Sequence, residues 1–326
     1  MTSWSERFGY VRTDLALEHH EALRGDFPEG MPGVRFHEEN RGGIRITRVE
    51  VTSPEGERIM GKPQGDYITI ECPELRRRNR ELQDEVAIIF SEQLEALLPS
   101  GWDSTLIVGL GNWNATPDAL GPRAVGQLLV TRHLREFVPE ELKGQLRSVA
   151  AIAPGVLGTT GIETGEIIRG LVEHVRPDFV IAIDSLAARS PDRVVTSIQL
   201  SDTGIHPGSG IGNKRVGITR ETLGVPVIAC GVPTVVHATT IAAVAIDLLV
   251  DRLRGQVQFF DIVNEMDQRD RIGLVHEVLS PDISNLMVTP KEIDVHILDM
   301  ARILASGLNA ALHRGIGADN LARYLM

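Results

Sequence analysis

Two short apolar runs, each with an aspartate close behind it, place the strongest constraint on how this chain can fold. Thr105-Leu-Ile-Val108 leads into the segment GLGNWNATPDALGP at positions 109–122, which contains Asp118. Phe179-Val-Ile-Ala-Ile183 runs directly into Asp184. Continuous apolar runs of this length are typical of strands buried in a parallel sheet, and open α/β sheets bind ligands at the carboxyl ends of such strands. We therefore expect Asp118 and Asp184 to lie at one site.

The pattern around these runs predicts an α/β fold. From position 105 onward, apolar strand-like segments alternate with helix-like segments, which favours a twisted, mostly parallel sheet flanked by helices. The expected strands are 105–109, 148–153, 179–183, 194–200 and 225–230. The expected helices are 119–134, 161–175, 235–253 and 290–312. We expect Thr289 to be the N-cap of the last helix, with Pro290 at its first position.

An additional, smaller β-rich region is expected at about 34–75. Apolar and polar residues alternate over 43–51 and again over 66–71. A period of two predicts strands, here antiparallel and exposed on one face. A helix is then expected over 75–98, opening with the basic run 76–78.

Composition argues against several classes of protein. The chain has 326 residues, and 42% hydrophobic with 24% charged residues is ordinary for a soluble protein of one large or two smaller domains. A net charge of −11 argues against a nucleic-acid surface. Two cysteines without metal-type spacing suit a reducing cytoplasm, and neither a signal peptide nor an apolar run of ~18 residues is present. We expect a cytoplasmic protein with no membrane or nucleic-acid partner.

Each aspartate has a structural as well as a functional interpretation. Thr116-Pro117-Asp118 fits the N-cap, N1 and N2 positions of a helix, where an acid complements the helix dipole by about 0.3–1 kcal/mol. The same position would stabilise an ionised carboxylate that acts as a base. Asp184 could simply close a strand as a turn residue, but at the carboxyl edge of a sheet it would face the crevice. Two carboxylates that share one proton can hydrolyse a peptide bond.

A metal site is the alternative that these residues leave open. His206 and His237 could join the two aspartates around a metal, although neither histidine has the HExxH spacing. The glycine-rich stretch 208–212 is expected to be a loop, because the residues after it do not open an apolar helix as a dinucleotide fingerprint requires. Neither a GxSxG elbow nor a P-loop is present. The motifs therefore predict an α/β hydrolase-like site with two aspartates.

At these residues the chain resembles the germination proteases of spore-forming bacteria, which degrade small acid-soluble spore proteins. The likeness covers nearly the whole chain. It is carried by the segments Tyr10–Ala16, 109–122, Ala153–Thr164, Ala182–Arg189, Asp202–Asn213 and Asn285–Ile293. Motifs of this length are far more specific than the short patterns above, and the departures lie mainly at the extreme N-terminus and after His313.

The resemblance implies an endopeptidase of atypical aspartic type, with Asp118 and Asp184 as its catalytic pair. It also implies an inactive homotetrameric zymogen in the cytoplasm of the forespore and spore core, and small acid-soluble spore proteins as substrates. The family's fold resembles that of the hydrogenase-maturation peptidases, which hold a metal with two acids and a histidine. We expect no cofactor here; a metal mechanism would use Asp118, Asp184 and either His206 or His237.

The resemblance extends to a cleavage site within the chain itself. Thr13-Asp14-Leu15-Ala16 is similar to the family's substrate signature, a Thr-acid-apolar-Ala tetrapeptide cut after the acid. We therefore expect self-cleavage between Asp14 and Leu15, which divides the chain into a propeptide, 1–14, and a single α/β peptidase domain, 15–326. Alternatively, Thr13 and Asp14 cap a helix that begins near Leu15. Three aromatic residues are expected to anchor the propeptide: Trp4, Phe8 and Tyr10.

Two other functions are kept as hypotheses. One is a metal-dependent amidase or peptidase, which a chelator would inactivate. The other is a protein that binds spore proteins without cutting them. The presence of both aspartates in this chain favours the peptidase.

Overall fold

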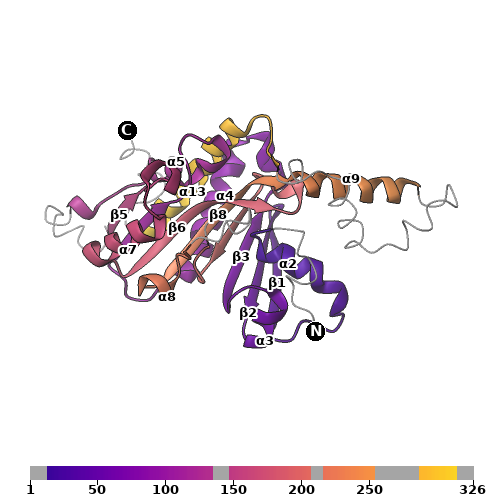
Figure 1. The fold of residues 1–326 in the computed structure, drawn as a ribbon, viewed down its shortest axis with the longest axis horizontal. Helices are drawn as coiled ribbons and strands as arrows, with labels where there is room; N and C mark the ends of the chain where they lie inside the picture. The colour runs from indigo at the N-terminus through magenta and orange to yellow at the C-terminus, as the bar shows by residue number, and fades with distance from the viewer. Residues whose placement is uncertain (1–12, 135–146, 207–215, 254–285, 314–326) are drawn as a thin grey trace.

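A computed structural model describes residues 13–134, 147–206, 216–253 and 286–313. The described strands form one nine-stranded sheet in the order β1-β2-β3-β7-β8-β6-β4-β5, with β9 paired to β8 (Figure 1). Their bounds are β1 Val34–Arg41, β2 Ile44–Val51, β3 Gly65–Glu71, β4 Ser104–Gly109, β5 Ser148–Ile152, β6 Phe179–Ala188, β7 Ser197–Ser201, β8 Val227–His237 and β9 Met287–Val288.

The helices precede, separate and follow these strands in the chain. The α-helices are α2 Ala16–Leu23, α3 Pro54–Met60, α4 Arg80–Leu97, α5 Leu120–Val125, α6 Leu157–Thr160, α7 Thr164–Val175, α8 Arg220–Leu223, α9 Ala238–Leu253 and α13 Ile293–Leu312. The 3₁₀ helices are η1 Arg24–Asp26, η2 Pro73–Arg77, η3 Thr116–Asp118, η4 Arg132–Leu134 and η6 Pro191–Arg193.

The sheet has a parallel and an antiparallel part. β5, β4, β6 and β8 pair in parallel, as the apolar runs predict. β1, β2 and β3 pair antiparallel to one another, and β3 reaches the rest of the sheet through β7, which is antiparallel to β3 and β8. The α/β prediction is confirmed, and the β-rich region extends the same sheet.

Both faces of the parallel part are covered, which explains why its strands are apolar throughout. Ile107 and Ile181 face a core shared with α4, α5 and α13. Leu106 and Val180 face the opposite way, toward α7 and α8. At the other end of the sheet, α2 and α3 pack on β2 and β3 (Figure 1).

The helix α13 is long and apolar enough to cross a membrane by length and composition alone. However, 61% of its most apolar 18-residue window is buried, and it packs against α4 and α5. Its apolar character is therefore that of a core helix.

Several predicted helix boundaries are wrong for identifiable reasons. The helix expected from position 75 begins at Arg80, because Asn79 caps it by accepting from the backbone N–H groups of Glu81 and Leu82. Thr289 is not the N-cap of α13, which begins at Ile293; its hydroxyl donates to the Thr234 carbonyl instead.

The helices expected at 119–134 and 161–175 also differ. The first is the short α5, after which η4 follows at 132–134. The second begins at Thr164, because Gly161 has a φ of 72° and closes the separate turn α6. The short length of α5 bears on the site, because the sequence predicts Asp118 in the first turn of the long helix expected at 119–134.

Candidate active site

Asp184 lies within β6 rather than at its end. The strand continues to Ala188, and Asp184 pairs with Gly231 of β8. The prediction that the strand stops at Ile183 is therefore wrong. However, β4 does end at this level, since Gly109 pairs with Ile183, so Asp184 lies just beyond the carboxyl end of its neighbour. The residue is 7% exposed, and its Oδ1 accepts from the Ser185 N–H at 2.9 Å.

A row of residues crosses three strands at this point. Asp184 on β6 pairs with Gly231 on β8, and Gly231 pairs with Gln199 on β7. Gly231 has no side chain to separate the other two, and a Cβ there would come 2.5 Å from the Leu186 Cγ atom. Because residue 231 is a glycine, no side chain projects from the middle of the row, between the Asp184 carboxylate and the Gln199 amide.

This row forms the floor of a small pocket. The volume is about 90 Å³, room for a few water molecules. Asp184, Gln199 and Gly231 line it from the sheet, and Asp14 and Lys62 line it from the N-terminal part of the chain. The pocket therefore brings Asp184 together with the residue before the expected cleavage site.

Asp14 is held in the pocket by both its backbone and its side chain. Its N–H donates to the Ala187 carbonyl at 3.0 Å, and its Oδ2 accepts from the Ala187 N–H at 2.9 Å. Its carbonyl oxygen accepts from Lys62 Nζ at 2.9 Å and from Gln199 Nε2 at 3.3 Å. The Asp14–Leu15 peptide is thus fixed between β6, β7 and the turn after α3.

The capping interpretation of Thr13 and Asp14 is only partly right. The helix α2 begins at Ala16 with Leu15 as its N-cap, in an extended conformation and without a side-chain cap. The Thr13 hydroxyl oxygen does accept from the Leu15 N–H at 3.1 Å. Leu15 is completely buried, so the expected cleavage site is shielded from solvent on its C-terminal side.

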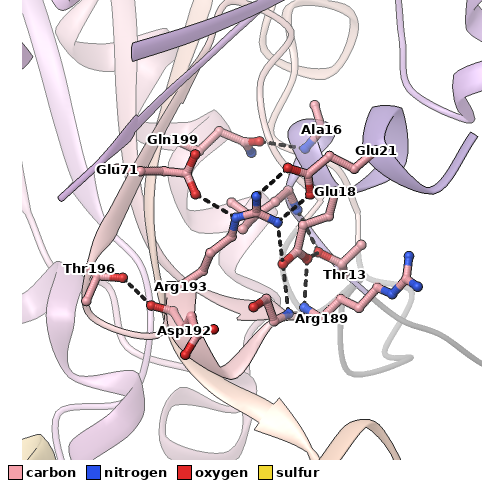
Figure 2. A network of polar contacts seen from close by, with 12 residues as sticks. Thr13, Ala16, Glu18, Glu21, Glu71, Arg189, Asp192, Arg193, Thr196 and Gln199 are labelled. Atoms are coloured by element: carbon pink, nitrogen blue, oxygen red, sulfur yellow. Dashed lines mark hydrogen bonds and ion pairs between the residues drawn. The ribbon is translucent and has the colours of Figure 1, made fainter. Parts of the chain in front are cut away.

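A buried charge network anchors α2 beside this site (Figure 2). Arg193 contacts three carboxylates, Glu18 at 3.2 Å, Glu21 at 2.6 Å and Glu71 at 2.8 Å. Burial alone would lower the pKa of the Arg193 guanidinium, but the hydrogen bond to Glu21 and the charges of Glu71 and Glu18 raise it above its ordinary value. Sequence reasoning missed this network, because its members are far apart in the chain.

Glu18 is the most buried member of the network. It accepts from the backbone N–H groups of Arg189 at 2.7 Å and Ser190 at 2.8 Å, and from the Thr13 hydroxyl. The contacts with Arg189 and Ser190 tie α2 to the residues that directly follow β6, five and six positions after Asp184 in the chain. The network therefore fixes Thr13 and Asp14 relative to the pocket.

Asp118 lies in the loop that follows β4. It ends the 3₁₀ helix η3, two residues before α5 begins, so its assignment to position N2 of an α-helix is wrong. Its Oδ2 accepts from the Asn112 N–H at 2.8 Å, and its carbonyl sits over Gly111, where a Cβ would come within 2.0 Å of the oxygen. Gly111 has a φ of 112°, a conformation that favours glycine.

This loop lies beside Asp184 without entering the pocket. The Leu110 N–H donates to the Ile183 carbonyl at 2.8 Å, and η3 contacts β6 and β8. Asp118 is not among the described residues that line the pocket. Asp118 and Asp184 thus lie at the same end of the parallel strands, but of these two only Asp184 lines the pocket.

The two histidines are widely separated. His206 is exposed at the rim of the pocket. His237 ends β8, six residues beyond Gly231, which is roughly 20 Å along a strand. Among the described residues, no three His, Cys, Asp or Glu side chains come together as a metal site. The proposed ligand set of Asp118, Asp184 and either histidine is therefore not assembled in this structure.

Comparison with known proteins agrees with the resemblance seen in the motifs. A family model described as germination protease matches residues 12–258 and 252–325. The chain is 50% identical to the germination protease of Caldanaerobacter subterraneus over 320 residues, which cover 97% of this chain and 98% of that one. It is 47% identical to the germination protease of Bacillus subtilis over 357 residues, with 96% of each chain covered.

Two further matches extend this comparison. The germination protease of Clostridium perfringens is 46% identical over 321 residues, which cover 97% of this chain and 99% of that one. Among solved structures, a [NiFe] hydrogenase maturation protease from Thermococcus kodakarensis matches 44% of this chain and 80% of its own, with a TM-score of 0.29 and 19% identity.

The full-length matches define the class of protein as an endopeptidase, a hydrolase of peptide bonds. The chain belongs to the germination protease family, as its motifs predict, and is a protease of spore germination. This assignment favours the peptidase over a protein that binds spore proteins without cutting them.

Proposed function

We propose that this endopeptidase starts the degradation of small acid-soluble spore proteins and is made as a zymogen that cuts itself between Asp14 and Leu15. One observation carries the proposal: Asp14, the residue before that bond, lines the same pocket as Asp184. While Asp14 is bound beside Asp184, its contacts with Ala187, Lys62 and Gln199 are not open to the acidic residue of another protein. The zymogen is therefore inactive toward other proteins until this segment leaves.

The reaction is that of an atypical aspartic peptidase, with Asp184 and Asp118 as the catalytic pair. One carboxylate, ionised, takes a proton from water as the water oxygen attacks the Asp14 carbonyl carbon. The other, protonated, supplies a proton as the C–N bond breaks, so the Leu15 nitrogen leaves as an amine. Two like charges close together titrate as a pair. The loop after β4 supports a role for Asp118, because it is hydrogen-bonded to β6 beside Asp184.

Substrate choice follows from the contacts of the N-terminal segment. The Ala187 N–H binds the Asp14 carboxylate, which supports a preference for an acidic residue before the cut. Leu15, the apolar residue that follows the cut, is completely buried. A spore protein with a Thr-acid-apolar-Ala segment presents the same groups in the same order.

The assembly and location follow from the same proposal. We place a homotetramer in the cytoplasm of the forespore and spore core. The exposed neighbours Leu248 and Leu249 on α9 support the assembly. Exposed apolar side chains grouped in this way are typical of interaction surfaces. The proposed reaction uses no cofactor. The proposed propeptide anchors Trp4, Phe8 and Tyr10 lie outside the described residues.

A cleavage assay tests the proposed function. The self-processed protein is incubated with a purified small acid-soluble spore protein, with and without EDTA, and the fragments are identified by mass. We expect cuts after the acidic residue of Thr-acid-apolar-Ala segments, at the same rate in EDTA. An intact spore protein, cuts at unrelated positions, or activity that EDTA removes and zinc restores would contradict the proposal.

A further inference from the structure

The carbonyl oxygen of Asp14 is bound by two side chains from separate parts of the fold. Lys62 Nζ donates to it at 2.9 Å, and Gln199 Nε2 donates to it at 3.3 Å. Lys62 follows Gly61, which ends α3 in a left-handed conformation with a φ of 64° and turns the chain toward the pocket. Gln199 lies on β7, in the row that also contains Asp184.

The orientation of the Gln199 amide is fixed by what it binds. Its Oε1 accepts from the Ala16 N–H at 2.7 Å (Figure 2), while its Nε2 faces a carbonyl oxygen, which can only accept. One amide thus binds the carbonyl before the Asp14–Leu15 bond and the N–H after Leu15. It holds the peptide on both sides of the bond that is to be cut.

The position of Lys62 places a cationic group near two carboxylates. Burial lowers the pKa of the Lys62 amine, and the charges of Asp14 and Glu18 oppose this effect. An amine donates a hydrogen bond in both its protonated and neutral forms. Lys62 can therefore donate to the Asp14 carbonyl in either state.

We propose that Lys62 and Gln199 form the oxyanion site of this peptidase. Attack of water on the Asp14 carbonyl carbon turns the C=O group into a C–O⁻ group, and the negative charge appears on the oxygen that both donors already contact. Donors aimed at developing charge stabilise the transition state more than the ground state. The same two side chains would bind the carbonyl of the acidic residue in a spore protein.

The step balances without any further reactant. The water oxygen bonds to the carbonyl carbon, its proton passes to a carboxylate, and a proton from a carboxylate goes to the Leu15 nitrogen as the C–N bond breaks. The oxyanion re-forms a C=O bond as the amine leaves, which gives a carboxylic acid at Asp14, and this acid passes its remaining proton to the new Leu15 amine, leaving a carboxylate and an ammonium group. Lys62 and Gln199 donate hydrogen bonds throughout and transfer no proton.

The inference rests on the proposed self-cleavage, and its test measures the rate of that cleavage in the full chain. Gln199→Glu replaces the donor by an oxygen and leaves an acceptor for the Ala16 N–H. Lys62→Gln removes the cation, and Lys62→Arg keeps a cationic donor. Gln64→Glu and Lys291→Gln, at exposed positions, are matched controls. The first-order rate constant comes from intact mass spectra after mild acid treatment, and melting temperatures check folding.

Removal of one oxyanion donor lowers kcat by about 10²–10³-fold in a peptidase of known mechanism. We expect losses of this order for Gln199→Glu and Lys62→Gln, partial recovery in Lys62→Arg, and control variants that cut like the wild type. Gln199→Glu or Lys62→Gln protein that melts like the wild type and cuts at its rate would overturn the oxyanion site alone. If a variant melts early, Lys62→Arg decides: a rate no better than that of Lys62→Gln contradicts the inference.

Other results would overturn the proposed function itself, and they can be told apart from failure of the oxyanion site. Wild-type protein that is not cut between Asp14 and Leu15, or Asp184→Asn protein that is cut there at the wild-type rate, overturns the proposed function and the oxyanion site together.

Discussion

Removing the Arg193 side chain should destabilise the protein strongly. The Arg193 side chain is 10% exposed, and its guanidinium contacts the carboxylates of Glu18 and Glu71, whose side chains are 1% and 7% exposed. The variant Arg193→Met keeps most of the volume and removes the charge. Two carboxylates then stay buried without the cation between them.

The burial of these side chains sets the expected loss in the free energy of unfolding. Breaking a buried ion pair by removing one partner costs about 3–5 kcal/mol of the free energy of unfolding. Some compensation remains, because Glu18 keeps two backbone N–H donors and Glu71 keeps an ion pair with Arg45 at 2.8 Å. Glu21 is 43% exposed and contributes little. We therefore expect a loss of about 3 kcal/mol, at the lower end of the range.

Urea unfolding at neutral pH, followed by circular dichroism, measures this loss. Arg35→Met is the control. Arg35 lies on the exposed strand β1, pairs with Glu50 of β2 and has a side chain that is 76% exposed, so a loss of about 0–1 kcal/mol is expected. Adding Glu18→Gln to Arg193→Met should recover part of the stability, since it removes one buried charge. A loss for Arg193→Met no larger than for Arg35→Met would refute the argument.

Two further predictions concern acid and packing. Burial, together with the charge of Lys62, lowers the pKa of His19 to about 3. The contribution of neutral His19 to stability is therefore complete above pH 6.5 and is lost as the pH falls from 6.5 toward 3. His19→Gln should flatten this acid slope by up to about 1.4 kcal/mol per pH unit, whereas His37→Gln on the exposed strand β1 should not, as urea titrations across pH would show. Gly231→Ala should cost about 1–3 kcal/mol in the same assay, because its Cβ meets Leu186; Gly170→Ala, on α7 with open space around it, should not destabilise, and equal effects would contradict this packing.

The parallel core was predictable because its signal is local. Leu106–Val108 and Phe179–Ile183 are apolar throughout, and both lie in buried parallel strands. The length of the strands was not predictable in the same way. β8 continues through Gly231 and Pro233, which usually end a strand, because the pairing of β6 with β8 shifts register next to Pro233. The extra length carries β6 past Asp184 to Ala187, where Asp14 binds.

The site was predictable only in part. Asp184 and Asp14 follow from motifs, and the structure brings them to one pocket. Lys62, Gln199 and Arg193 have no local signature, because each acts on a residue far away in the chain. Asp118 fits a helix start by sequence, but its carboxylate binds the Asn112 N–H in a loop instead. Long-range contacts of this kind depend on the order of the strands, which no short pattern fixes.

Self-cleavage of the full chain tests the central claim most directly, that the pocket containing Asp184 cuts the Asp14–Leu15 bond. Wild-type, Asp184→Asn, Asp118→Asn and the exposed control Asp192→Asn proteins are held in mild acid and analysed by intact mass and N-terminal sequencing. We expect Leu15 as the new N-terminus in the wild type and in Asp192→Asn, and uncut chain in the other two, each with a near wild-type melting temperature. A different N-terminus, or Asp184→Asn protein that is cut between Asp14 and Leu15 as fast as the wild type, would contradict the account.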